Sequence, residues 1–368
     1  MKATTDRVVI QSPSHRIASG QLSRRGFMSG PLAVAVIAAC RSAPSGGRAV
    51  ATKENQVNTS VKDYIIIHPL DPDDVAPMSA LRAMVKPTKG MARGVDARAP
   101  FDAVMERVQP RNGVTFEPDN VGGIPGLWVR PADARPDEVI LHLHGGWFNM
   151  GTANAYRHLV AQVAARAGVA VFVPDYRLAP EHPFPAAPED ALTCYRGLDS
   201  RGFRRIAITG DSAGGDLALI LASRVTAEEP SARTTLVGVA VMSPVTDLSL
   251  SGETYETRAD ADPFFTRSQV AELVKAYLGS ADPKDPLASA LHARLSGLPA
   301  IRIDVGDDEL LLDDSRRYVE RAVAAGVDAQ LHVWMGMPHG FPSSVGMARA
   351  SARALDAIGA FLAERLRS

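Results

Sequence analysis

The sequence predicts an α/β fold in which a mostly parallel sheet carries helices on both faces. From residue 139 onward, short apolar runs typical of buried strands alternate with amphipathic helical patterns. Two earlier runs flank Gly122 and Gly123 and fit an antiparallel hairpin at one edge of the sheet. Polar and glycine-rich segments follow several strands directly, at the carboxyl ends where sheets of this class bind ligands.

Eight strands and eight helices are expected along the chain. The strands lie at 114–117, 127–130, 139–143, 169–173, 206–209, 237–241, 301–305 and 330–334. The helices lie at 77–85, 100–108, 153–167, 188–198, 214–225, 268–278, 314–325 and 348–366. Residues 63–74 contain two prolines and are expected to be irregular.

The composition is that of an ordinary globular protein. Charged residues make up 22% of the chain and hydrophobic residues 46%, and the formal net charge is -1. This balance gives no support for a nucleic-acid partner. The body of the chain contains no run of the ~18 apolar residues that a membrane span needs. Cys40 and Cys194 are the only cysteines, so no disulfide framework is encoded.

Residues 1–40 have the parts of an export signal. Five basic residues precede a short apolar run at 31–39, and the segment around Arg24 and Arg25 resembles the twin-arginine signature. Ile-Ala-Ala-Cys at 37–40 resembles a lipobox, in which Cys40 would be lipidated and tether the protein to a membrane. Residues 41–60 are expected to be a flexible tether. We therefore expect an exported protein, periplasmic or anchored through Cys40; with the leader retained, it would be cytoplasmic.

The most informative segment is Gly-Asp-Ser-Ala-Gly-Gly at 210–215. It follows an apolar run and precedes a helical pattern, which is the strand, sharp turn and helix of a G-x-S-x-G nucleophile elbow. Such a turn projects the serine hydroxyl into a cleft, and Gly210 and Gly214 let the turn close. Ser212 is therefore the candidate nucleophile.

A second segment, His-Gly-Gly-Trp at 144–147, directly follows the strand at 139–143. Negative charge develops on a carbonyl oxygen when serine attacks, and fixed backbone N–H donors stabilise it. Gly145 and Gly146 can offer their N–H groups without an intervening side chain, and Ala213, after the nucleophile, offers a third. These three residues form the candidate oxyanion hole.

His339 is the candidate base, because a serine hydroxyl needs an imidazole to take its proton. Of nine histidines, only His339 occupies a late loop in the order nucleophile, acid, histidine. The strand at 301–305 is followed by Asp307, Asp308 and Glu309, one of which would orient the imidazole. Spacing alone does not choose between Asp308 and Glu309.

Together these segments resemble the hormone-sensitive-lipase-like esterases, a bacterial branch of the α/β-hydrolase fold. The likeness rests on His-Gly-Gly at 144–146, Asp-Tyr-Arg-Leu-Ala-Pro-Glu at 175–181 and the serine segment at 210–215. It implies an α/β-hydrolase fold with a helical cap at 61–110 and a catalytic domain at 111–368. In this family the acid lies about thirty residues before the histidine, which favours Glu309 as the acid. Acyl transfer by a serine, a histidine and an acid needs no metal and no organic cofactor, so none is expected.

One position departs from the family pattern, since Trp147 stands where a third glycine is usual. We expect Trp147 to border the substrate site, to narrow it and to favour compact, short-acyl esters.

The expected reaction is hydrolysis of a small ester through an acyl-enzyme intermediate. Lactone or amide hydrolysis with the same triad stays open, although no propeller-like second domain of the peptidase kind is evident. A non-catalytic receptor on this fold would be expected to lack a triad member. A metal hydrolase based on His142 and His144 is disfavoured because no carboxylate cluster lies nearby with ligand spacing. The oligomeric state is open, with a homodimer as one expectation.

Overall fold

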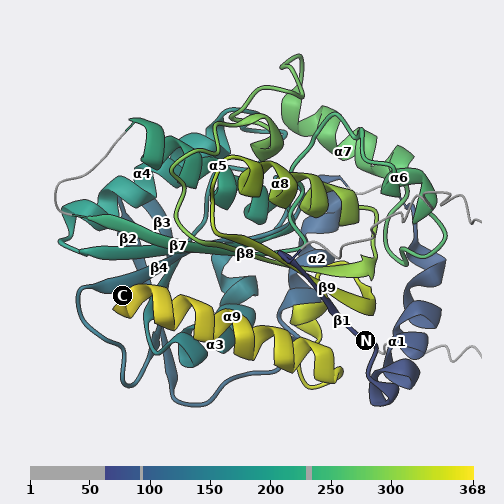
Figure 1. The fold of residues 1–368 in the computed structure, drawn as a ribbon, viewed down its shortest axis with the longest axis horizontal. Coiled ribbons are helices and arrows are strands. Elements are labelled where there is room, and N and C mark those ends of the chain that lie inside the picture. The colour runs from purple at the N-terminus through teal and green to yellow at the C-terminus, as the bar shows by residue number, and fades with distance from the viewer. Residues whose placement is uncertain (1–62, 92–93, 229–233) are drawn as a thin grey trace, which may run out of the picture. The chain divides into compact units, whose positions relative to one another are not determined.

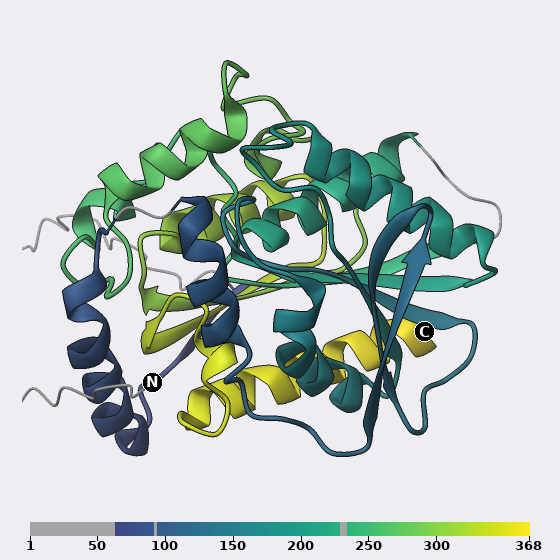
Figure 2. The same cartoon turned by 180° about the vertical axis from the view of Figure 1, so that it is seen from behind.

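The computed structural model describes residues 63–91, 94–228 and 234–368. The export signal expected at 1–40, with Cys40, and the tether expected at 41–60 lie outside the described residues. The described chain belongs to one compact unit, drawn from opposite sides in Figures 1 and 2. Among the described helices, none combines the length and apolar character needed to cross a bilayer.

The described residues form one sheet of nine strands in the order β1-β9-β8-β7-β6-β4-β5-β3-β2. The strands are β1 Ile65–His68, β2 Val114–Val121, β3 Ile124–Pro131, β4 Glu138–Leu143, β5 Ala170–Pro174, β6 Arg205–Asp211, β7 Thr235–Met242, β8 Ile301–Asp308 and β9 Ala329–Pro338. Only β3 pairs antiparallel, with β2 and with β5, so the mostly parallel sheet is confirmed for this part of the chain.

The leading hairpin is also confirmed. β2 and β3 pair antiparallel up to Val121 opposite Ile124, which leaves Gly122 and Gly123 as the turn. Both glycines have positive φ, 65° and 93°, as a two-residue hairpin turn of this kind requires.

The sequence prediction is wrong at the opposite edge, where eight strands become nine. Ile65–His68 form β1, which pairs parallel with β9, instead of an irregular segment. Nε2 of His68 lies 3.0 Å from Nδ1 of His332, and the His68 ring stacks on Trp334 with centroids 3.8 Å apart. These residues therefore belong to the main sheet, although the predicted cap at 61–110 included them. A four-residue strand offers too little alternation to detect.

Helices cover both faces of the sheet, as predicted. Figure 1 shows α3 (Ala153–Ala167) and α9 (Arg349–Arg367) on one face, and α4 (Ala186–Ser200), α5 (Ser212–Glu228) and α8 (Leu312–Ala324) on the other. Each face has its own apolar layer. Leu159 and Ile358 belong to the first layer, and Leu217 and Val319 to the second.

The remaining α-helices are α1 (Pro72–Val85), α2 (Arg98–Met105), α6 (Thr254–Thr257) and α7 (Arg267–Leu278). All eight predicted helices are present with small shifts at their ends, and α6 is an additional single turn. The local sequence explains where some of the helices begin and end. For example, the Thr152 hydroxyl accepts the N–H of Ala155 to begin α3, and Gly168 ends that helix with a φ of 66°.

Parallel strands bring their carboxyl ends to the same edge of the sheet. The residues that follow β4, β6, β7, β8 and β9 therefore meet in space, however far apart they lie in the chain. Ser212, Ala213, Glu309, His339 and the loop at 144–147 all lie in these segments, and Asp307 and Asp308 end β8.

Candidate active site

Ser212 is the first residue of α5 and lies in the strained turn that directly follows β6. Its φ is 53°, which is rare for a residue with a Cβ. Gly210 and Gly214 make this turn sterically feasible. A Cβ on Gly210 would lie 2.3 Å from the carbonyl oxygen of Gly214, and one on Gly214 would lie 2.0 Å from that of Leu143. The geometry of a nucleophile elbow is thus present around Ser212.

Three predicted residues form a continuous hydrogen-bonded chain. Nε2 of His339 lies 3.0 Å from Oγ of Ser212, and Nδ1 of the same ring lies 2.8 Å from Oε2 of Glu309. Because a carboxylate only accepts, the proton of a neutral imidazole belongs on Nδ1, and Nε2 accepts from the serine. All three side chains are largely or fully buried.

The structure also separates the three consecutive acids. Glu309 is fully buried, and its Oε1 accepts the Ser243 hydroxyl at 2.8 Å and the Gly306 N–H at 2.7 Å. Asp308 instead forms an ion pair with Arg82 of α1, and Asp307 accepts the N–H of Gly336. Of the two acids that spacing left open, Glu309 is the one that faces His339.

The surroundings of His339 favour its protonated form. Burial lowers the pKa of the imidazole, but the hydrogen bond and charge of Glu309, with the charges of Asp262 and Asp211, outweigh burial and raise it. A base with a raised pKa holds the proton taken from serine more firmly.

The loop after β4 turns sharply through three residues with positive φ. These are Gly146 at 119°, Trp147 at 53° and Phe148 at 59°. A Cβ on Gly146 would lie 2.2 Å from the carbonyl oxygen of Met150, so only glycine fits there. The described residues provide no hydrogen-bond acceptor for the N–H groups of Gly146 and Trp147.

The assignment of Gly145 as an oxyanion donor is wrong for this structure. Its N–H already donates to Oδ1 of Asp211, 3.1 Å away. Oδ2 of Asp211 accepts the hydroxyl of Tyr156 at 3.1 Å. Asp211, the residue directly before the nucleophile, therefore connects the nucleophile turn to Gly145 at the start of the loop after β4. Sequence reasoning missed this role, although Asp211 lies within the elbow motif.

His142 and His144 are buried behind this loop. His144 stacks on Tyr176 with ring centroids 4.2 Å apart, and the Tyr176 hydroxyl donates to the His144 carbonyl at 2.7 Å. Burial lowers the pKa of His144. In the part of the chain that the structure describes, no group of three metal-ligating side chains is found.

Trp147 is buried in an aromatic row that reaches His339. Its ring meets Phe265 edge to face, with centroids 5.5 Å apart and planes at 82°. Phe265 in turn meets the His339 ring at 5.2 Å and 76°. The ring of Phe265 therefore lies between the Trp147 indole and the His339 imidazole.

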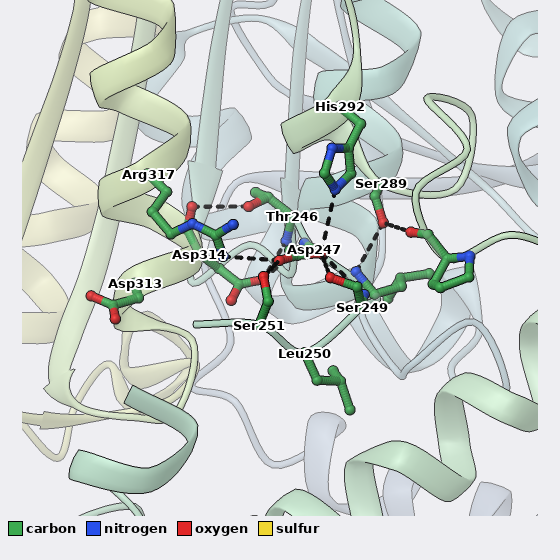
Figure 3. Close-up of polar contacts among 12 residues, drawn as sticks. Thr246, Asp247, Ser249, Leu250, Ser251, Ser289, His292, Asp313, Asp314 and Arg317 are labelled. Atoms are coloured by element: carbon green, nitrogen blue, oxygen red, sulfur yellow. Dashed lines mark hydrogen bonds and ion pairs between the residues drawn. The ribbon is translucent and has the colours of Figure 1, made fainter. Parts of the chain in front are cut away.

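A buried polar network supports the loop after β7, which begins with Ser243. Oδ2 of Asp314, in α8, accepts the N–H groups of Thr246 and Asp247 at 2.8 and 2.9 Å. Asp247 also pairs with Arg317 at 2.9 Å. Figure 3 shows these contacts converging from the loop and from α8. They anchor the same loop that begins with Ser243, whose hydroxyl donates to Glu309 and which no sequence signal had identified. Burial raises the pKa of Asp314 to about 8.

Comparison with known proteins agrees with this geometry. A family model described as α/β hydrolase fold matches residues 140–343. An acetyl-hydrolase of Streptomyces hygroscopicus is 36% identical over 245 residues, which cover 66% of this chain and 80% of that protein. An esterase of Acinetobacter venetianus is 33% identical over 72% of this chain and 87% of its own length.

Solved structures give the same result. The crystal structure of an esterase from the bacterial hormone-sensitive lipase family superposes with a TM-score of 0.74 at 35% identity. The match covers 79% of this chain and 98% of that one.

Proposed function

Because the chain belongs to the hormone-sensitive-lipase-like esterases of the α/β-hydrolase fold, we propose that it hydrolyses small esters through an acyl-enzyme on Ser212. The observation that carries this proposal is the hydrogen-bonded chain from Ser212 through His339 to Glu309. The relatives are named as esterases and acetyl-hydrolases, and the roles of Ser212, His339 and Glu309 are our proposal for this chain.

In the first half of the reaction, Oγ of Ser212 attacks the ester carbonyl carbon and its proton passes to Nε2 of His339. Glu309 accepts from Nδ1, so it fixes the tautomer and stabilises the imidazolium that forms. The imidazolium then gives its proton to the departing alkoxide, and the acyl group stays on Ser212. In the second half, water attacks the acyl group, again through His339, and releases the acid.

The developing oxyanion needs donors close to Ser212. Gly146 and Ala213 keep the roles that the sequence predicted for them. The N–H of Gly145 is engaged by Asp211, so we assign the remaining donor to the backbone N–H of Trp147. The left-handed turn at these residues supports this choice, since such turns direct successive N–H groups into one concavity.

Trp147 also supports a preference for small acyl groups. The indole is buried against Phe265, where the family pattern has only a hydrogen atom. The indole fills space next to Phe265, whose own ring lies against the base. Short-chain acyl esters are therefore the substrates that we propose, with lactones and amides as alternatives for the same triad.

The decisive experiment uses an organophosphate probe and a ladder of p-nitrophenyl esters. We expect the wild-type protein to be labelled at Ser212 and to hydrolyse acetate and butyrate esters, and Ser212→Ala to lose both properties while keeping its melting temperature. Ser280→Ala, an exposed serine, is the matched control. Unlabelled Ser212 in a folded wild-type protein would favour a receptor, and turnover of amides or lactones alone would change the substrate class.

We also propose that residues 1–40 direct export and that Cys40 carries a lipid. Mass analysis of the N-terminus of the protein produced in a bacterial host tests both statements. A chain beginning at a lipidated Cys40 supports the anchor, and Cys40→Ala should then abolish membrane association. An intact leader on a cytoplasmic protein would overturn the proposal.

A further inference from the structure

Asp262 is a fully buried acid outside the triad. It lies between α6 and α7, and its Oδ1 accepts the N–H groups of Phe264 and Phe265 at 2.8 and 2.9 Å. Its Oδ2 accepts the N–H of Leu310 at 2.9 Å. In the described part of the chain, no Lys or Arg side chain forms an ion pair with Asp262. Backbone N–H groups alone therefore hold this carboxylate.

The two carboxylate oxygens of Asp262 connect two different segments that border the active site, one at Phe265 and one at Leu310. The Oδ1 side fixes Phe265, whose ring lies edge to face with the His339 imidazole, centroids 5.2 Å apart. The Oδ2 side fixes Leu310, the residue directly after Glu309. One carboxylate thus joins the neighbour of the base to the loop that carries the acid.

We propose that Asp262 is a positioning residue for His339, which holds Phe265 against the imidazole and locks the loop of Glu309. This inference rests on the proposed function, because it assumes that His339 acts as the base. Phe265 limits rotation of the imidazole on one side, while Glu309 holds it through Nδ1. Both constraints depend on Asp262.

Electrostatics add to this role. Burial lowers the pKa of His339, and three carboxylates from different elements oppose it: Glu309 after β8, Asp262 before α7 and Asp211 at the end of β6. The other groups that face the ring, Ser212 and Phe265, are neutral. Of these three carboxylates, Glu309 is the one that hydrogen-bonds to the imidazole, so Asp262 acts on the ring through its charge and through Phe265.

The test compares Asp262→Asn with Asp260→Asn, which removes the same charge from an exposed position two residues earlier. The readout is the pH dependence of kcat/KM for p-nitrophenyl acetate. The acidic limb of this profile reports the pKa of the base in the free enzyme. We expect Asp262→Asn to shift this limb down by about half a pH unit or more. We also expect kcat to fall about tenfold with KM little changed. Asp260→Asn should match the wild type.

A second measurement does not depend on turnover. NMR titration of the His339 imidazole in the Ser212→Ala protein, with and without Asp262→Asn, gives its pKa directly. A downward shift supports the proposal even if the natural reaction is not ester hydrolysis. An unchanged imidazole pKa together with an unchanged kcat, in a folded Asp262→Asn protein, would overturn it.

If Asp262→Asn does not fold, Phe265→Leu tests the contact between Phe265 and the His339 imidazole. This variant keeps an apolar side chain and the charge of Asp262 but removes the ring beside the imidazole. We expect kcat to fall several-fold while the acidic limb of the pH profile stays in place. A kcat equal to that of the wild type would refute the positioning role of Phe265 and, with it, the proposal.

Discussion

The carboxylate of Glu309 holds the imidazole of His339 through a 2.8 Å contact between Oε2 and Nδ1. Its other oxygen is fixed by the Ser243 hydroxyl and the Gly306 N–H. A carboxylate with both oxygens engaged in this way has one orientation, and so does the ring that it binds.

Removing this carboxylate should be far more damaging than removing its neighbour. We expect Glu309→Ala to lower kcat by ~10³-fold or more, because the imidazole loses its tautomer and orientation. Asp308→Ala should change kcat only a few-fold, because Asp308 pairs with Arg82 of α1. Steady-state kinetics on one ester, with circular dichroism to verify folding, measure the ranking. The opposite ranking would move the role of the acid to Asp308.

Trp147 should set the acyl chain length that the enzyme accepts. Replacing the indole by a hydrogen atom opens space beside Phe265, and glycine tolerates the φ of 53° at this position. We expect Trp147→Gly to raise kcat/KM for octanoate relative to acetate esters by about tenfold. Phe264→Leu, which changes the residue directly before Phe265, serves as a control for non-specific loss of packing near the site. An unchanged acyl profile in Trp147→Gly would show that the indole does not limit the site.

Asp314 should make stability depend on pH. Burial raises its pKa to about 8 in the fold, far above the ordinary value of an aspartate. The folded protein therefore binds this proton more tightly than the unfolded chain does. Stability from this group is fully present below about pH 4 and is lost as the pH rises through about 8.

The substitution Asp314→Asn separates this effect from others. The amide oxygen can still accept the N–H groups of Thr246 and Asp247, and the side chain no longer ionises. We expect the melting temperature of the wild type to fall between about pH 5 and pH 9 by several degrees more than that of the variant. Asp328→Asn changes an exposed acid and should follow the wild type. Parallel curves for all three proteins would contradict the prediction.

Gly214 should be indispensable to the elbow. A Cβ at this position would lie 2.0 Å from the carbonyl oxygen of Leu143 and 2.4 Å from that of His144. Both atoms are backbone, so neither can move aside cheaply. We expect Gly214→Ala to lower the free energy of unfolding by about 3 kcal/mol or to prevent folding. At Gly94 the added Cβ meets nothing within 4 Å, and Gly94→Ala should melt like the wild type.

The central strands and the helices were predictable because each has a strong local signal. Buried parallel strands such as β4 and β7 appear as apolar runs, and α3 has a clear start at Thr152 and a clear end at Gly168. β1 has no comparable signal. Its four residues gain their order from pairing with β9, and that pairing is not visible in the local sequence.

The site residues divide in the same way. Ser212 and His339 follow from motif and chain order, but the choice between Asp308 and Glu309 depends on a local irregularity. The pairing of β8 with β9 shifts register between Gly306 and Asp308, and this changes the direction of the side chains that follow. The engagement of Gly145 by Asp211 is likewise a matter of orientation, which residue type and spacing do not specify.

The pairing of β1 with β9 has a consequence for how the protein is made. His68 and His332, which meet at 3.0 Å, are separated by 264 residues, so nearly the whole chain must be synthesised before this edge can close. A chain shortened beyond Ile65 would present β9 as a bare strand edge, and such edges readily pair with a second copy.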